Sequence, residues 1–133
     1  MNDKLIRAAA EARKNAYAPY SKFPVGAAVL TSSNRIFTGC NIENVSFGLT
    51  ICAERVAIAN AVAAGEQEIE AIAVVADGTP SSPCGACLQV IQEFASGKSL
   101  TIISANTSGS VIVRLLSDYM PYGFTDFKPD GDL

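Results

Sequence analysis

The stretch Ile69–Ala105, IEAIAVVADGTPSSPCGACLQVIQEFASGKSLTIISA, decides the fold. It opens with the apolar run Ile69–Ala76 and closes with a second one, Leu100–Ala105, and each predicts a buried strand. Between them, Asp77–Pro83 is rich in turn-forming residues, and Cys84–Ala95 predicts a helix. This alternation of strand, helix and strand indicates an α/β domain.

The flanking residues add further helices and strands. Asp3 is expected to cap a helix that runs to about Ala16. The other expected elements are a hairpin of Val25–Leu30 and Arg35–Ile42, a loop over Glu43–Thr50, a largely buried helix over Ile51–Ala64, a strand at Val111–Val113 and a short helix at Arg114–Tyr119. The pattern predicts a three-layer α/β/α sandwich with a mixed five-stranded sheet, formed by residues 1–133 as a single domain.

The composition excludes several kinds of chemistry. The 133 residues include four cysteines and no histidine. Without histidine, a Ser-His-Asp triad and a histidine-based zinc helix are both excluded. Proton transfer near neutral pH therefore falls to a carboxylate, lysine, tyrosine or thiol. A transition-metal site would be built mainly from cysteine.

The net charge and the hydropathy also limit the kinds of binding partner that we expect. The net charge of −3 provides no basic surface for a phosphate backbone, so we expect no nucleic acid partner. No uncharged apolar run approaches the about 18–20 residues of a membrane span, so we expect no membrane partner. A cytoplasmic location follows as the default, with cysteines that serve as ligands or free thiols. The hydrophobic share of 49% suggests further burial in an oligomer.

Two cysteine-containing stretches each open a predicted helix: Thr50–Arg55, TICAER, and Ser82–Cys87, SPCGAC. Cys84 and Cys87 project from the same face of a helix, and the helix N-terminus favours the thiolate that a metal requires. A C-x-x-C pair alone is equally a redox motif or half of a zinc ribbon. If the two helices lie side by side on the sheet, Cys52 joins the pair, and three thiolates leave the fourth zinc position open, as in catalytic sites.

Glu54 is the nearest acid to these cysteines. Residues two apart on a helix diverge by about 200°, so Glu54 reaches the open side of the zinc only if the metal lies off the helix end. There it would transfer protons. In the alternative interpretation, Glu54 is a charge at a helix start that is favoured by the helix dipole.

Together the two stretches resemble the signature of zinc-dependent nucleoside deaminases. Three more blocks resemble the small homotetrameric cytidine deaminases, in the same order and over nearly the whole chain: Tyr20–Ala28, Gly39–Asn44 and Met120–Phe124. The resemblance implies a pyrimidine-salvage enzyme that converts cytidine or deoxycytidine to uridine or deoxyuridine and ammonia. It also implies one zinc ion per subunit, bound by Cys52, Cys84 and Cys87, and a homotetramer with sites completed across subunits.

The resemblance assigns roles to further residues. Glu54 would pass a proton from water to N3 of the pyrimidine and assist the departure of ammonia, while Arg55 would hydrogen-bond the thiolates. The implied substrate-binding residues are Phe23 against the base, Ala53 at its edge, Asn41 and Glu43 at the ribose hydroxyls, and Phe47 and Phe124 at a neighbouring subunit's site. Without the resemblance, Asn41 and Glu43 are typical of a turn-forming loop, the phenylalanines of a core, and Arg55 of a surface cation.

The chain departs from the family pattern at two positions. Leu88 follows the third cysteine, where a second arginine is usual, and Phe47 stands where a tyrosine is usual. With one cation fewer, we expect a more electron-rich zinc, a less acidic water, and a shifted pH optimum or altered substrate tolerance. Two alternatives remain open: a deaminase of a modified cytosine nucleoside, such as blasticidin S or an N4-substituted cytidine, and a structural zinc or redox module. Cys40 is interpreted as a small core residue of a strand.

Overall fold

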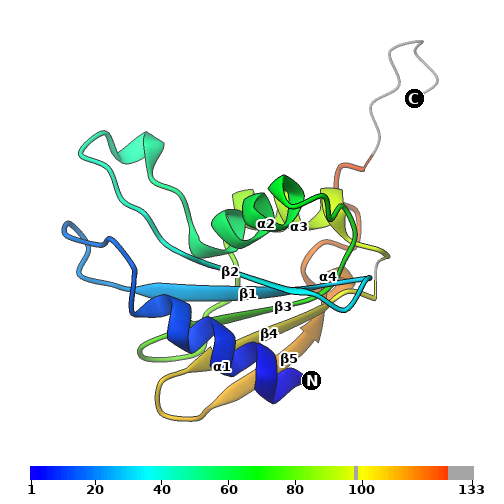
Figure 1. Ribbon diagram of the computed structural model, residues 1–133, viewed down its shortest axis with the longest axis horizontal. Helices are drawn as coiled ribbons and strands as arrows, with labels where there is room; N and C mark the ends of the chain where they lie inside the picture. The colour runs from blue at the N-terminus through cyan, green and yellow to red at the C-terminus, as the bar shows by residue number, and fades with distance from the viewer. Residues whose placement is uncertain (98, 126–133) are drawn as a thin grey trace.

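The protein forms a five-stranded mixed sheet with helices on both faces, in a computed structural model that describes residues 1–97 and 99–125 (Figure 1). The strands are β1 (Val25–Thr31), β2 (Ile36–Cys40), β3 (Ile69–Ala76), β4 (Thr101–Asn106) and β5 (Val111–Leu115). Their order across the sheet is β2-β1-β3-β4-β5. The pair β3 and β4 is parallel, and the other pairs are antiparallel. The mixed α/β sheet predicted from the sequence is confirmed.

The helices form the two outer layers. Helix α1 (Asn2–Arg13) packs against one face of the sheet, and α2 (Ala53–Ala63) and α3 (Gly85–Phe94) lie side by side on the other (Figure 1). The one-turn helix α4 (Leu116–Tyr119) follows β5. Helix α3 connects the parallel strands β3 and β4, because a parallel pair needs a crossover segment.

Alternation along β1 divides the core between the two faces. Ala27 and Val29 are buried in the cluster beneath α2 and α3, whereas Ala28 and Leu30 are buried in the cluster beneath α1. The central strand β3 is buried on both faces, which explains its continuous apolar sequence.

Two glycines allow helices to lie directly on the sheet. A Cβ atom at Gly26 would lie 2.0 Å from the carbonyl oxygen of Ala9 in α1. A Cβ atom at Gly39 would lie 2.4 Å from the amide nitrogen of Ala57 and 2.7 Å from the carbonyl oxygen of Ala53 in α2. Gly39 therefore sets how closely the first turns of α2 approach β2.

Some expected boundaries are wrong. Helix α1 begins at Asn2 with Met1 as its N-cap residue, so Asp3 lies in the first turn and does not cap the helix. Strand β5 runs to Leu115, because Arg114 and Leu115 continue the pairing with β4, and α4 starts only after it. Strand β2 ends at Cys40, which is half-buried at its end.

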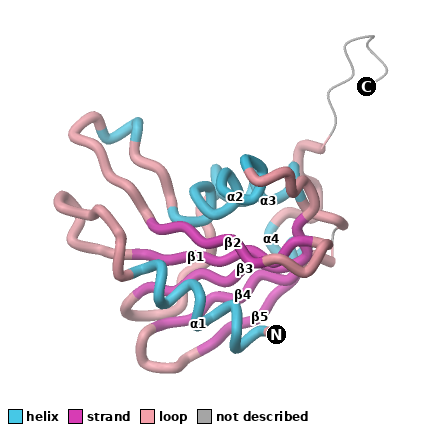
Figure 2. The backbone as a smooth tube through the Cα atoms, viewed as in Figure 1, coloured by secondary structure: helices cyan, strands magenta, loops and turns pink. Residues whose placement is uncertain are grey.

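Two loops project from the same side of the molecule, one between α1 and β1 and one between β2 and α2 (Figure 2). The second loop carries the short 3-10 helix η1 (Phe47–Leu49), which the sequence interpretation left as plain loop. Bridges from Ile42 to Tyr17 and Ile51 join the bases of these loops. None of the helices in the described ranges is both long enough and apolar enough to cross a membrane.

Candidate metal centre and active site

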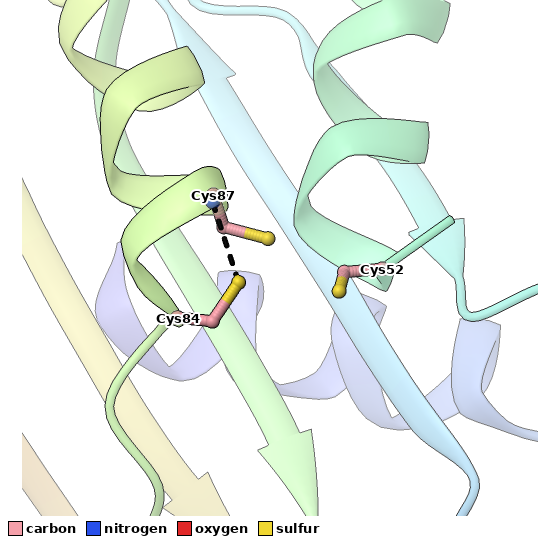
Figure 3. A group of neighbouring side chains, drawn as sticks. All are labelled: Cys52, Cys84 and Cys87. Atoms are coloured by element: carbon pink, nitrogen blue, oxygen red, sulfur yellow. Dashed lines mark hydrogen bonds between the residues drawn. The ribbon is translucent and has the colours of Figure 1, made fainter. Parts of the chain in front are cut away.

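The three predicted zinc ligands come together where α2 and α3 begin (Figure 3). Cys52 is the N-cap residue of α2, and Cys84 is the N-cap residue of α3. Cys87 lies in the first turn of α3, and its backbone N–H donates to Sγ of Cys84 at 3.4 Å. The three sulfur atoms lie within 4.8 Å of one another. As N-caps, Cys52 and Cys84 place their thiols off the helix ends, as the spacing of Cys52 and Glu54 requires.

This donor set fits a zinc ion. Zn–S bonds of about 2.3 Å in a tetrahedron place neighbouring sulfurs about 3.8 Å apart, close to the spread found here. Thiolates are soft ligands that suit zinc rather than magnesium or calcium. Three protein ligands leave the fourth position open, which is the arrangement of catalytic rather than structural zinc sites.

The groups around Cys52 favour its ionised form over the neutral thiol. A hydrogen bond from Cys87, together with the Arg55 guanidinium, lowers the pKa of Cys52 to about 5. The same hydrogen bond and burial raise the pKa of Cys87, so Cys52 ionises first. A metal ligand must be a thiolate, and Cys52 meets this requirement at neutral pH.

Arg55 lies against the thiol cluster and not on the open surface. Its Nη2 atom donates to Sγ of Cys52 at 3.7 Å and to the carbonyl oxygen of Thr50 at 3.3 Å. Its Nε atom is buried and has no hydrogen-bond partner among the described residues. Leu88, one turn beyond Cys84, packs into the core beneath α2 and α3 and is 8% exposed.

Glu54 faces a cavity of about 220 Å³ beside the thiols. The residue is only 6% exposed, and burial raises the pKa of its carboxyl group above the ordinary value. Four other predicted site residues line the same cavity: Phe23, Asn41, Cys52 and Ala53. A buried carboxyl group therefore lines the same cavity as one thiol of the cysteine cluster.

A second cavity, of about 390 Å³, adjoins the first at Thr50, which lines both. Its other walls are Tyr20, Ser21, Glu43 and Phe47. The rings of Tyr20 and Phe47 meet edge to face, with their centroids 5.7 Å apart. Two predicted substrate-binding residues thus lie beside the Glu54 cavity and not within it.

Asn41 and Glu43 already hold the loop before β1. The Nδ2 atom of Asn41 donates to the carbonyl oxygen of Phe23 at 2.9 Å, and its Oδ1 atom accepts from the Val25 amide at 2.9 Å. The Glu43 carboxylate accepts from the backbone amides of Tyr20 and Ser21 and from the Ser21 hydroxyl. Their contacts with ribose hydroxyls stay predictions.

Phe124 lies apart from both cavities. Its carbonyl oxygen accepts hydrogen bonds from Nε2 of Gln89 at 2.9 Å and from Nε2 of Gln92 at 2.6 Å, so the segment around it is fastened to α3. The residue is 65% exposed. Its contribution to a neighbouring subunit also stays a prediction.

Three hydroxyl residues of the cavity wall were missed from the sequence: Thr50, Ser81 and Ser82. Thr50 and Ser82 are the first residues of the two cysteine stretches, and this adjacency to the cysteines is the signal that identifies them. The other walls, Val25, Val74, Ala76 and Ala105, lie in strands and are typical core residues in sequence.

Comparison with known proteins agrees with this geometry. A family model described as the cytidine and deoxycytidylate deaminase zinc-binding region matches residues 1–103. Cytidine deaminase from Sporosarcina psychrophila is 47% identical over 124 residues, which cover 92% of this chain and 90% of that protein.

Solved structures are similar over the same extent. The crystal structure of cytidine deaminase from Burkholderia pseudomallei matches with a TM-score of 0.88 at 46% identity, covering 93% of this chain and 99% of that chain. Cytidine deaminase from Mycobacterium tuberculosis matches with a TM-score of 0.80 at 40% identity, covering 92% of this chain and 95% of that chain. The thiol cluster fits zinc, a buried glutamate lies beside it, and the relatives match almost the whole chain. This chain therefore belongs to the cytidine deaminase family.

Proposed function

We propose that the protein hydrolyses cytidine and deoxycytidine to uridine or deoxyuridine and ammonia. One observation carries the proposal: the buried carboxyl group of Glu54 faces the cavity that Cys52, one of the three clustered thiols, also lines. The reaction adds water at C4 of the base, breaks the bond from C4 to the exocyclic nitrogen and releases that nitrogen as ammonia. It needs an activated water and a group that moves protons between water, N3 and the leaving nitrogen.

The residues divide this work between them. Cys52, Cys84 and Cys87 would hold the zinc ion, which when bound acidifies a water molecule and so supplies a nucleophile near neutral pH. The Glu54 carboxylate accepts a proton from the attacking water, gives it to N3 and later helps protonate the departing nitrogen. Burial raises the pKa of Glu54 toward the operating pH, which suits a group that must both accept and give up a proton.

The two cavities take different parts of the nucleoside. The smaller one is lined by Phe23, Ala53 and Glu54 and takes the pyrimidine ring, with the Phe23 ring packed against the base. The adjoining one, lined by Glu43 and Phe47, takes the ribose, and Asn41 meets it from the wall of the smaller cavity. The continuous wall at Thr50 supports this orientation.

Stoichiometry, assembly and location complete the proposal. One thiol cluster in the described chain supports one zinc ion per subunit. The exposed apolar side chains around η1 and the exposed Phe124 support a homotetramer in which subunits complete one another's sites. The four cysteines form no disulfide, which supports a location in the cytoplasm, where thiols stay reduced. A role in pyrimidine salvage follows from the proposed substrates and products.

Glu54→Gln tests the catalytic role. We expect turnover of cytidine, followed by ultraviolet absorbance, to fall by at least about 100-fold, because an amide cannot carry the proton. Zinc content, measured by metal analysis, should stay the same. The matched control is Glu93→Gln on the exposed side of α3, which should leave both quantities unchanged. Full activity in Glu54→Gln would contradict the catalytic role of Glu54. A zinc-loaded unchanged protein that turned over no cytosine nucleoside would instead support a structural zinc or redox module.

Substitution of single cysteines tests the ligands. Cys84→Ser should lose zinc and activity together. Cys40 lies outside the cluster, so Cys40→Ser should keep both.

A panel of cytosine nucleosides tests the substrate class. Faster turnover of blasticidin S or of an N4-substituted cytidine than of cytidine would favour the alternative that Leu88 suggests.

A further inference from the structure

The segment Thr79–Pro83 forms one wall of the Glu54 cavity and leads directly into the zinc ligand Cys84. Ser81 and Ser82 line the cavity, and Cys84 caps α3. Upstream, the segment is held at Gly78, whose carbonyl oxygen accepts from Nδ2 of Asn106 at 2.6 Å. Its position therefore affects both the shape of the cavity and the place of one ligand.

Very little holds this segment in place. Within the described residues, the backbone of Thr79–Pro83 makes no backbone–backbone hydrogen bond. The bond from the Ser81 hydroxyl to the carbonyl oxygen of Thr79 lies inside the segment. A single hydrogen bond joins the segment to another element in the described part of the chain: the Ser82 hydroxyl donates to the phenol oxygen of Tyr119 at 3.4 Å.

Tyr119 is joined to the rest of the fold through α4. It belongs to α4, where Leu116 is buried in the main core and the Asp118 carboxylate accepts from the Leu115 amide at 2.8 Å. The phenol oxygen also accepts from Nη1 of Arg114 in β5 at 3.5 Å. The hydroxyl of Ser104 in β4 is buried and has no hydrogen-bond partner among the described residues.

The protonation behaviour of Tyr119 agrees with this arrangement. Burial raises the pKa of its phenol, but hydrogen bonds from Ser82 and Arg114 lower it overall. Polar groups of β5 and the cavity wall therefore meet at one side chain, and neither is needed for the proposed proton transfers.

We infer that Tyr119 is a positioning residue for the active site: its phenol holds Ser82, and through Ser82 it sets the cavity wall and the place of Cys84. The inference rests on the proposed function for its catalytic consequence. Its structural part, that the phenol restrains residues 79–87, holds independently of any activity.

Tyr119→Phe tests the inference, because it removes the hydroxyl and keeps the ring. Losing one hydrogen bond should make amide hydrogen exchange of a peptide covering residues 79–87 about threefold to tenfold faster. Exchange in α1 should not change. Tyr122→Phe removes a hydroxyl from a side chain that is 97% exposed and is the matched control.

Two further measurements follow the consequence at the site. Zinc should pass to a colorimetric chelator faster from Tyr119→Phe than from the unchanged protein, by a similar factor, because Cys84 is less well held. KM for cytidine should rise while kcat changes less, since Ser82 lines the cavity and Glu54 is untouched. Ser82→Ala should reproduce the faster exchange, and the double variant should exchange no faster than either single one.

The results separate this inference from the proposed function. Unchanged exchange over residues 79–87 in Tyr119→Phe would overturn the inference, as would additive effects in the double variant or an equal rise across the whole chain. If the protein failed to deaminate cytidine, the proposed function would fail, but exchange and zinc release would still decide the role of Tyr119.

Discussion

At the scale of single residues, the charge balance around the thiols depends on Arg55. Its guanidinium contacts Sγ of Cys52, and a zinc ion bound to three thiolates would carry a net charge of about −1. Leu88, which directly follows Cys87 in α3, contributes an apolar side chain to the core. The chain therefore packs a hydrocarbon where a second cation would further offset this charge.

Leu88→Arg tests this balance. A second guanidinium near the sulfurs should make the attacking water more acidic, so the acidic limb of the pH profile of kcat/KM should move to lower pH. Forcing a larger, charged side chain into the core should lower the free energy of unfolding by about 1–3 kcal/mol. Leu88→Met, which nearly conserves volume, is the control for packing. If Leu88→Arg left both the pH profile and the zinc affinity unchanged, the charge argument would be wrong.

Glu43 supplies a second prediction. Hydrogen bonds from the Ser21 hydroxyl and from the backbone amides of Tyr20 and Ser21 lower the pKa of its carboxyl group. Only the ionised Glu43 carboxylate accepts all of these hydrogen bonds. The restraint that it places on the loop is therefore complete above the ordinary pKa of glutamate, and it is lost as the pH falls through the lowered pKa of Glu43. Ser21→Ala should raise the midpoint of the Glu43 carboxyl resonance in a carbon NMR titration. The same midpoint should not move in Ser108→Ala, on a distant turn.

The residues of the candidate site that lie at helix starts were predictable from the sequence. Cys52, Cys84 and Glu54 are identified by their places at helix starts, where backbone geometry is local. The bonds of Asn41 and Glu43 to the loop before β1 were not predictable, because they join residues far apart in the chain through side-chain orientations. Arg55, by contrast, contacts Sγ of Cys52 as the family resemblance implied.

At the scale of elements, the site depends on where α2 rests on the sheet. Gly39 lies directly under Ala53 and Ala57, in the turns that follow Cys52. No side chain fits between the strand and the helix at this point. The position of Cys52 and Glu54 is therefore set from below by the backbone of β2.

Gly39→Ala should push the first turns of α2 away from the sheet. We expect the free energy of unfolding, measured by chemical denaturation, to fall by at least about 1–3 kcal/mol, and zinc affinity to fall with it. Gly48→Ala is the matched control, because a Cβ atom at Gly48 meets nothing within 4 Å. A variant at Gly39 as stable as the one at Gly48 would contradict the close approach.

Helices and strands were predictable where burial imposes a clear hydrophobic pattern on the sequence. Ile69–Ala76 has the predicted bounds because both of its faces are buried. Helix starts are less clear, since an acid such as Asp3 favours the first turn through the helix dipole as much as it favours the cap. The 3-10 helix η1 has no buried residue, so no periodic pattern marks it.

At the scale of the whole molecule, the apolar surface exceeds what one chain needs. Val45, Phe47 and Leu49 on the projecting loop are all strongly exposed. An apolar groove between α2 and α3 is lined by Ile58, Val62, Val90 and Phe94, with Arg55 at its end. Such patches are typical of protein interfaces.

The oligomeric state in solution is therefore a direct test. Light scattering coupled to size exclusion should give the mass of a tetramer under assay conditions. Leu49→Asp should shift the protein to smaller species and reduce activity, because charge at a buried interface is unfavourable. Ser108→Asp, on an exposed turn, should remain tetrameric. A fully active monomer would contradict the proposed assembly.

The layout of the thiol cluster has a consequence for folding. Cys52 lies well before Cys84 and Cys87 in the chain, and α3 belongs to the crossover that joins the parallel strands β3 and β4. The complete set of thiols therefore exists only where this crossover is in place on the sheet. A zinc ion bound to all three thiols would join the start of α2 to the crossover and stabilise the folded chain over the unfolded one.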